Sequence, residues 1–203
     1  MIAIVDYGVG NLFSLKSSFA AVGAETAVVS DAAGLRAANK LILPGVGAFG
    51  DAAAMLRESG LAEPLLEEVS SGKPLMGICL GMQLLFTKGL EYGEHRGLDL
   101  IPGTVRPIAG VIPAGLKIPH IGWNALQLTA PEDPILRSVR SGDCVYFVHS
   151  FFAETEPRYV SAVADYGAPL TASVRRETVW GCQFHPEKSG KVGLGILRSF
   201  CEL

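Results

Sequence analysis

The sequence has few charged residues and no long hydrophobic run. Asp, Glu, Lys and Arg make up 18% of its 203 residues, against about 25% in typical soluble domains. Its longest charge-free stretches, residues 74–87 and 118–131, are shorter than the roughly 18 apolar residues that cross a bilayer. The N-terminus lacks the basic segment of a signal peptide. Since 49% of the residues are hydrophobic, disorder is also excluded, and we expect a soluble, cytoplasmic protein.

Basic clusters and metal-binding patterns are missing as well. The formal net charge is −3 and no basic run exceeds Arg175–Arg176, which argues against binding to nucleic acid. The sequence has no CxxC pair, no metal-ligand spacing of His, Asp or Glu, and no glycine-rich nucleotide motif. We therefore expect no metal and no cofactor. Three of the four cysteines are predicted to be core residues: Cys144, Cys182 and Cys201. Two of the histidines, His95 and His120, are predicted to lie at the surface or at an interface.

Short apolar runs alternate with helical patterns in the first half of the chain. The expected strands are 2–5, 25–29, 40–43 and 74–78, and the expected helices are 12–22, 52–56, 61–69 and one that begins over 82–86. Such uninterrupted apolar strands between helices are typical of a parallel sheet that is covered on both faces.

After about residue 90 the pattern becomes alternating and rich in turn residues. The segments 99–108, 123–128, 143–153, 159–164 and 172–183 are predicted to be antiparallel strands, followed by a helix over 191–200. They either extend the sheet or add a small layer. We predict a single α/β domain over 1–203, with an open, mostly parallel, flavodoxin-like sheet covered by helices on both faces and antiparallel strands in its second half.

The segment Gly77-Ile78-Cys79-Leu80-Gly81 lies between an expected strand and an expected helix. It has the form of a nucleophile elbow, in which the turn is too tight for a side chain next to the nucleophile. The positive end of the helix favours a thiolate. The five residues alone are equally compatible with a tight turn around an inert, buried cysteine.

A general base for this cysteine is found in Phe184-His185-Pro186-Glu187. Residues two apart on an extended chain face the same side, so Glu187 can orient the His185 ring. Together with Cys79 they make the nucleophile, base and orienting acid that acyl transfer requires. An oxyanion site is expected from the N–H of Leu80 and from the loop Pro44-Gly45-Val46-Gly47, which follows a strand at the same sheet edge.

These three segments resemble the three signatures of the class I glutamine amidotransferases, in the same order and over nearly the whole chain. Three further segments resemble the glutaminase subunits of imidazole glycerol phosphate synthases within that family: Asp6-Tyr7-Gly8-Val9-Gly10-Asn11, Pro119-His120-Ile121-Gly122-Trp123-Asn124 and Phe147-Val148-His149-Ser150-Phe151. The resemblance implies that Cys79 attacks the side-chain amide of glutamine, that His185 moves the protons, and that water hydrolyses the resulting thioester. It also implies that Gln83, Glu91, Ser150 and Phe151 bind the substrate, and that Gly45 and Val46 switch the oxyanion site by a peptide flip.

The resemblance further implies a heterodimer with a (β/α)₈ barrel cyclase that receives the ammonia. That subunit makes imidazole glycerol phosphate and an aminoimidazole carboxamide ribotide in histidine biosynthesis. Asn11, Trp123, Asn124 and Lys188 would face it. Three alternatives remain open: the glutaminase subunit of another class I enzyme, such as pyridoxal phosphate synthase, a non-catalytic regulatory relative, and a cysteine hydrolase or peptidase with the same elbow.

Overall fold

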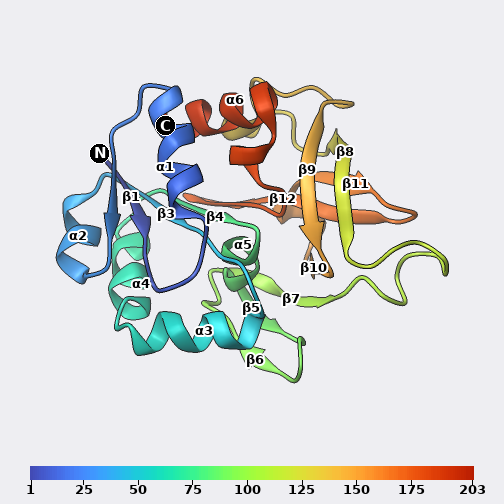
Figure 1. Cartoon of the computed structure of the whole chain (residues 1–203), viewed down its shortest axis with the longest axis horizontal. Helices are drawn as coiled ribbons and strands as arrows, with labels where there is room; N and C mark the ends of the chain where they lie inside the picture. The colour runs from blue at the N-terminus through green and yellow to red at the C-terminus, as the bar shows by residue number, and fades with distance from the viewer.

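The computed structural model describes all 203 residues and contains two β-sheets (Figure 1). The larger sheet has nine strands, in the spatial order β2 (Thr26–Val29), β1 (Ile2–Val5), β3 (Lys40–Leu43), β4 (Leu75–Ile78), β13 (Val179–Cys182), β12 (Pro169–Arg176), β11 (Val160–Asp165), β8 (His120–Leu128) and β9 (Cys144–His149). The smaller sheet has four, in the order β10 (Phe151–Glu154), β7 (Ile101–Pro107), β5 (Phe86–Gly89) and β6 (His95–Arg96).

The large sheet changes character at β13. The strands β2, β1, β3, β4 and β13 pair in parallel, whereas β12, β11, β8 and β9 continue the sheet with antiparallel pairs. The predicted α/β class, with a parallel first half and antiparallel strands later, is confirmed. The second half of the chain both extends the main sheet and builds a second layer.

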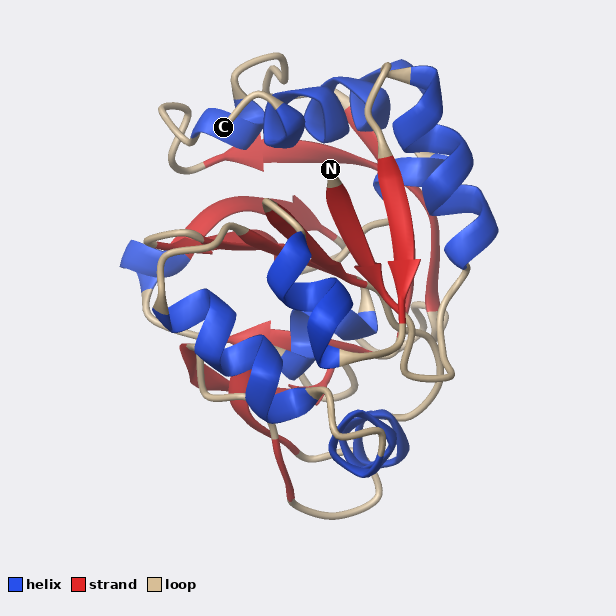
Figure 2. Cartoon of the chain, turned by 90° about the vertical axis from the view of Figure 1, so that its left-hand side faces the viewer, coloured by secondary structure: helices blue, strands red, loops and turns tan.

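Six α-helices cover the two faces of the parallel strands (Figure 2). One face is packed by α1 (Leu12–Ala21) and α6 (Gly190–Cys201). The other is packed by α2 (Ala32–Ala37), α3 (Phe49–Glu58), α4 (Ala62–Ser70) and α5 (Leu80–Leu84). None of these helices combines the length and the hydrophobicity that a membrane span requires.

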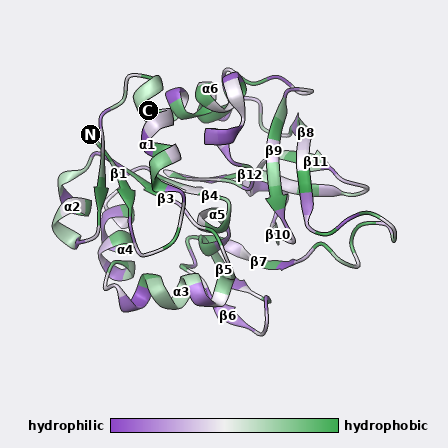
Figure 3. Cartoon of the chain, viewed as in Figure 1, coloured by the Kyte–Doolittle hydropathy of each residue, from purple (hydrophilic) through white to green (hydrophobic).

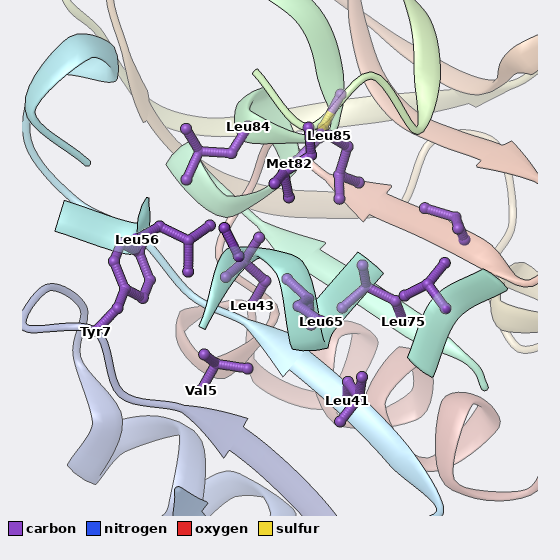
Figure 4. Packing of buried hydrophobic residues seen from close by; sticks show 14 of the residues in the cluster. Val5, Tyr7, Leu41, Leu43, Leu56, Leu65, Leu75, Met82, Leu84 and Leu85 are labelled. Atoms are coloured by element: carbon purple, nitrogen blue, oxygen red, sulfur yellow. The ribbon is translucent and has the colours of Figure 1, made fainter. Parts of the chain in front are cut away.

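The core divides into two apolar clusters because side chains alternate along each strand. In β1, Ala3 and Val5 belong to the cluster under α3 and α4 (Figure 4), whereas Ile2 and Ile4 belong to the cluster under α1 and α6. In Figure 3 the hydrophobic colour is strong on β1, whereas α3 and α4 carry both hydrophobic and hydrophilic colours, as expected of helices with one buried face. Burial on both faces explains why β1, β3 and β4 are apolar apart from Lys40 at the start of β3.

Several elements differ from the sequence prediction. The helix after the elbow begins at Leu80 and ends at Leu84, and Phe86 already begins β5, where it is fully buried and pairs with β7. The helix α2 was not predicted, because six residues are too few for a periodic pattern; its N-cap Asp31 accepts a hydrogen bond from the Gly34 N–H at 2.7 Å. The segments 143–153 and 172–183 each form two strands.

Candidate active site

Cys79 lies at the carboxyl end of β4, at the centre of the large sheet. Its backbone has φ 55° and ψ −114°, a conformation with positive φ that residues other than glycine rarely adopt. A Cβ on Gly77 would lie 2.5 Å from the Gly81 carbonyl oxygen, and one on Gly81 would collide with the carbonyl oxygen of Leu43 on β3. The flanking glycines are therefore needed because two backbone segments approach closely, as the motif predicts.

His185 reaches the same edge of the sheet from the neighbouring strand. The strands β4 and β13 are parallel, and Ile78 is paired with Cys182, so the residues that follow both strands emerge together. Nδ1 of His185 lies 2.7 Å from Oε1 of Glu187, and the Glu187 side chain is only 2% exposed. The structure thus brings Cys79, His185 and Glu187 into one site.

The His185 ring is held in an environment that favours its cationic form. Burial alone would lower its pKa, but hydrogen bonds with the Cys79 thiol and the Glu187 carboxylate, together with their charges, raise it to about 9. The bond to Glu187 fixes the proton on Nδ1 and leaves Nε2 for the sulfur. The second carboxylate oxygen, Oε2, is buried without a partner, so the charge on Glu187 is balanced mainly through His185.

The expected oxyanion loop packs directly on the N-terminus of α5. A Cβ on Gly45 would lie 2.8 Å from the Gly81 backbone nitrogen and 2.9 Å from Cβ of Leu80. The Tyr7 hydroxyl donates a hydrogen bond to the Pro44 carbonyl oxygen at 2.8 Å and so fixes the start of the loop. Burial raises the pKa of this hydroxyl. Val46 is exposed and lines the pocket, and Gly47 has φ 101°.

A pocket of about 350 Å³ opens over Cys79, a size that fits a small metabolite. Its walls contain every predicted catalytic and substrate-binding position except Gly45 and Glu187: Val46, Cys79, Leu80, Gln83, Glu91, Ser150, Phe151 and His185, together with Gly47, Pro119, Val148, His149 and Lys188. A larger surface hollow of about 710 Å³ lies between α3 and β6, but it contains none of the predicted catalytic residues.

Gln83 is buried in the pocket wall and does not face solvent. Its Nε2 donates to the Phe151 carbonyl oxygen at 3.1 Å and to Oε1 of Gln183 at 2.9 Å, and no protein group donates to its own carbonyl oxygen. Gln183 in turn donates to the Cys79 sulfur at 3.9 Å. Sequence reasoning missed Gln183, although it lies two residues before His185 and therefore has the same orientation on an extended chain.

Glu91 combines a position in the pocket with a structural contact. One carboxylate oxygen accepts a hydrogen bond from the Phe49 N–H at 2.7 Å. Phe49 is the first residue of α3, and the N-cap of this helix, Ala48, has no side-chain acceptor. A negative charge at a helix N-terminus is stabilising. Glu91 thus joins the loop after β5 to α3 beside the pocket.

The residues expected to face a partner differ in their surroundings. Trp123 is 55% exposed, Asn11 caps α1 by accepting from the Ser14 N–H at 3.2 Å, and the Lys188 ammonium lies 5.8 Å from the Tyr146 ring centre. Asn124 is half-buried and makes internal hydrogen bonds to His120 and to the Asp165 carbonyl oxygen. Ile118 and Ile121, also exposed, extend the apolar surface near Trp123.

Three minor predictions are wrong. His120 is buried, with 1% exposure, because β8 and β9 enclose it beside His149. Cys144 is exposed at the start of the edge strand β9, and Cys201 is only half-buried near the end of the chain. No group of His, Cys, Asp and Glu has the arrangement of a metal site.

Comparison with known proteins identifies the family. The family model described as glutamine amidotransferase class-I matches residues 3–202. The chain belongs to the class I glutamine amidotransferases. Among curated members of this family, the imidazole glycerol phosphate synthase subunit HisH of Syntrophotalea carbinolica is 47% identical, and the alignment covers both chains completely. The HisH subunit of Methanothermobacter thermautotrophicus is 48% identical over all of this chain and 98% of its own.

Two solved structures share the fold of this chain. A glutamine amidotransferase crystal structure superposes with a TM-score of 0.77 at 21% identity, covering 100% of this chain and 98% of the other. The structure of PurLQS from Thermotoga maritima gives a TM-score of 0.76 at 21% identity, covering 99% and 97%. At this identity the likeness supports the fold alone.

Proposed function

We propose that this chain is the glutaminase subunit of an imidazole glycerol phosphate synthase, which releases ammonia from glutamine for a cyclase subunit in histidine biosynthesis. The proposal rests on one observation above all: the Cys79–His185–Glu187 constellation lies in a pocket of a chain that is 45–48% identical, over nearly its full length, to HisH subunits. The four cysteines are unpaired, as is usual in the reducing cytoplasm, where we place the protein.

In the proposed reaction, the Cys79 sulfur attacks the side-chain carbonyl carbon of glutamine. His185 takes up the thiol proton and then delivers it to the departing amide nitrogen, which leaves as ammonia. The same imidazole then removes a proton from water, whose oxygen attacks the thioester and releases glutamate and the free thiol. Glu187 keeps His185 in the tautomer with Nε2 toward sulfur, and stabilises the imidazolium that forms twice in each cycle.

The tetrahedral intermediates of this reaction carry a negative oxygen that needs N–H donors. We assign one to the Leu80 N–H at the start of α5, and the second to the Gly45–Val46 peptide, which packs against the same helix start. A flip of this peptide would switch the second donor on or off. Because Val46 is exposed beside the pocket, a partner docked there has direct access to the switch.

We assign recognition of the amino-acid end of glutamine to Gln83, Glu91, Ser150 and Phe151. The free carbonyl oxygen of Gln83 and the carboxylate of Glu91 suit the substrate ammonium group, whereas backbone N–H groups near Ser150 and Phe151 suit its carboxylate. Glutamine fits this set because both charged groups on its α-carbon then meet a complementary group.

The partner in this proposal is the (β/α)₈ barrel cyclase, which combines ammonia with a ribotide to give imidazole glycerol phosphate and an aminoimidazole carboxamide ribotide. We place the docking face around Trp123 and Lys188, with Asn11 at its edge and Asn124 beneath it. Exposed aromatic side chains are typical anchors of protein interfaces.

The deciding experiment measures glutaminase activity of the chain with and without the cyclase subunit and its ribotide substrate. Glutamate formation that depends on Cys79, and that increases when cyclase and ribotide are present, is the expected result. Cys79→Ala should remove turnover, whereas His95→Gln, outside the pocket, should leave it unchanged. Equal rates with and without the cyclase would contradict the switch, and full activity of Cys79→Ala would contradict the catalytic assignment.

A further inference from the structure

Two buried histidines, one of which lines the pocket, contact each other and have no assigned role in the reaction. His120 on β8 is paired with His149 on β9 in the antiparallel ladder. Their exposed fractions are 1% and 6%. Nδ1 of His120 lies 3.0 Å from Nε2 of His149, a hydrogen-bond distance between two ring nitrogens.

The outer nitrogen of each ring already determines where its proton is. Nδ1 of His149 lies 2.8 Å from the Phe151 carbonyl oxygen, which only accepts, so this nitrogen carries a proton. Nε2 of His120 lies 2.7 Å from Oδ1 of Asn124. The orientation of that amide is fixed because its Nδ2 donates to the Asp165 carbonyl oxygen at 3.2 Å, so Nε2 of His120 also carries a proton.

Two neutral rings in these tautomers would direct two lone pairs at each other. A neutral imidazole has one N–H and one lone pair, and both N–H groups point outward here. The inner contact at 3.0 Å is therefore a hydrogen bond only when the pair holds one additional proton. The same distance without that proton would place two unshared electron pairs together in a buried site.

The surroundings favour His120 as the ring that carries this proton. Phe147 and Tyr166 both stack nearly parallel on the His120 ring, with centroid distances of 5.0 and 4.0 Å, so they occupy its two faces. Aromatic faces attract cations. Burial lowers the pKa of His120, and the hydrogen bond to Asn124 opposes that effect. The lone pair of His149 and the two aromatic faces oppose it further.

The neighbouring groups disfavour a second proton on the pair. Burial and the charges on His120 and His185 lower the pKa of His149 to about 4, although its bond to Phe151 acts in the opposite direction. No carboxylate bonds to either ring: the Asp165 carboxylate accepts from the Gly167 N–H instead. The Tyr166 hydroxyl donates to the Lys117 carbonyl oxygen, so it offers neither ring a hydrogen bond.

We propose that His120 and His149 are positioning residues that share one proton at neutral pH. The His120 imidazolium donates to His149, and His149 donates to the Phe151 carbonyl oxygen in the pocket wall. That oxygen also accepts from Gln83 at 3.1 Å, so the Nδ1–H of His149 helps to hold the backbone where the substrate binds. Only the statement that the substrate binds at this backbone rests on the proposed function.

The shared proton is tested by ¹H–¹⁵N spectra of the ring nitrogens in the full chain labelled with ¹⁵N-histidine. The chain has four histidines, so single replacements assign every signal, and His95→Gln serves as the control outside the pair. At neutral pH we expect two protonated nitrogens on His120 and a neutral His149 with its proton on Nδ1. In His149→Asn the acceptor is lost and His120 becomes neutral. A neutral His120 in the unsubstituted chain would overturn the proposal.

The positioning role is tested by the kinetics of two His149 variants with the cyclase present. His149→Ala removes the donor to Phe151 and should raise the KM for glutamine about tenfold, with a smaller change in kcat. His149→Asn places an amide nitrogen where Nδ1 was and should recover most of that loss. Unchanged KM in His149→Ala would overturn the positioning role. If the unsubstituted chain shows no Cys79-dependent turnover, the proposed function fails, whereas the spectra still decide the shared proton.

Discussion

Cys79 has a strained backbone that its neighbours maintain. With φ at 55°, the residue departs from the conformations that a side chain prefers, at a cost of about 1–3 kcal/mol. The surrounding contacts stabilise it: Gly77 and Gly81 allow β3, β4 and α5 to approach each other. The strain keeps the sulfur at the pocket surface, beside His185.

Glu187 should matter for rate more than for substrate binding. Glu187→Gln removes the charge that helps to raise the pKa of His185, and we expect kcat to fall about 100-fold or more, with little change in KM. Steady-state glutaminase kinetics of the complex check this. The matched control is Glu63→Gln on the exposed side of α4, which should match the unsubstituted enzyme. A rise in KM without a fall in kcat would contradict the assignment.

The same histidine should make stability depend on pH on the alkaline side. The pKa of His185 is about 9 in the folded chain and about 6.5 when unfolded, so its stabilisation is complete below about pH 6.5 and is lost as the pH rises to about 9. We expect the free energy of unfolding to fall by about 3 kcal/mol across this window. Urea unfolding at a series of pH values measures it. The slope should be smaller in His185→Gln; an identical slope would show that other groups cause it.

Single residues differ in how far the sequence predicts them. The positions of Cys79 and His185 followed from motifs in which glycine and proline restrict the backbone. Burial of Gln83 and His120 did not follow, because a polar residue on a short helix or strand gives no local sign of which neighbours will satisfy it. Their partners, Gln183 and His149, are 100 and 29 positions away in sequence.

At the scale of elements, the site depends on the contact between β3 and the start of α5. Gly81→Ala should destabilise the fold by about 3 kcal/mol or more, since its Cβ would collide with the Leu43 carbonyl oxygen, which β3 holds in place. Gly60→Ala is the control: its Cβ meets nothing within 4 Å, so only the backbone strain of about 1 kcal/mol remains. Chemical unfolding of both variants compares them, and equal losses would contradict the packing argument.

Elements buried on both faces were the easiest to predict. The runs that became β1, β3 and β4 are short and apolar apart from Lys40, and their bounds were found within a residue or two. The start of β5 was misread as helix because Phe86 continues the apolar pattern of α5, and only its long-range pairing with β7 decides its conformation. The same reason explains why 172–183 was not divided into β12 and β13.

At the scale of the whole molecule, the exposed surface around Trp123 should control assembly rather than folding. Trp123→Ala should weaken association with the cyclase by about 2 kcal/mol, or roughly 30-fold in Kd, and leave the stability of the isolated chain nearly unchanged, because the side chain is 55% exposed. Binding titrations and thermal unfolding measure the two effects. Val28→Ala, exposed on β2 at the opposite edge of the sheet, is the control. Unaltered affinity of Trp123→Ala would place the interface elsewhere.

The position of β13 in the sheet has a consequence for the protein during synthesis. It is the last strand in the chain, yet it fills the centre of the sheet between β4 and β12, and it is followed directly by His185. While the ribosome is still translating the earlier segments, the parallel half of the sheet ends at an open β4 edge and Cys79 has no base. The nascent chain therefore cannot hydrolyse glutamine before β13 and His185 have been synthesised.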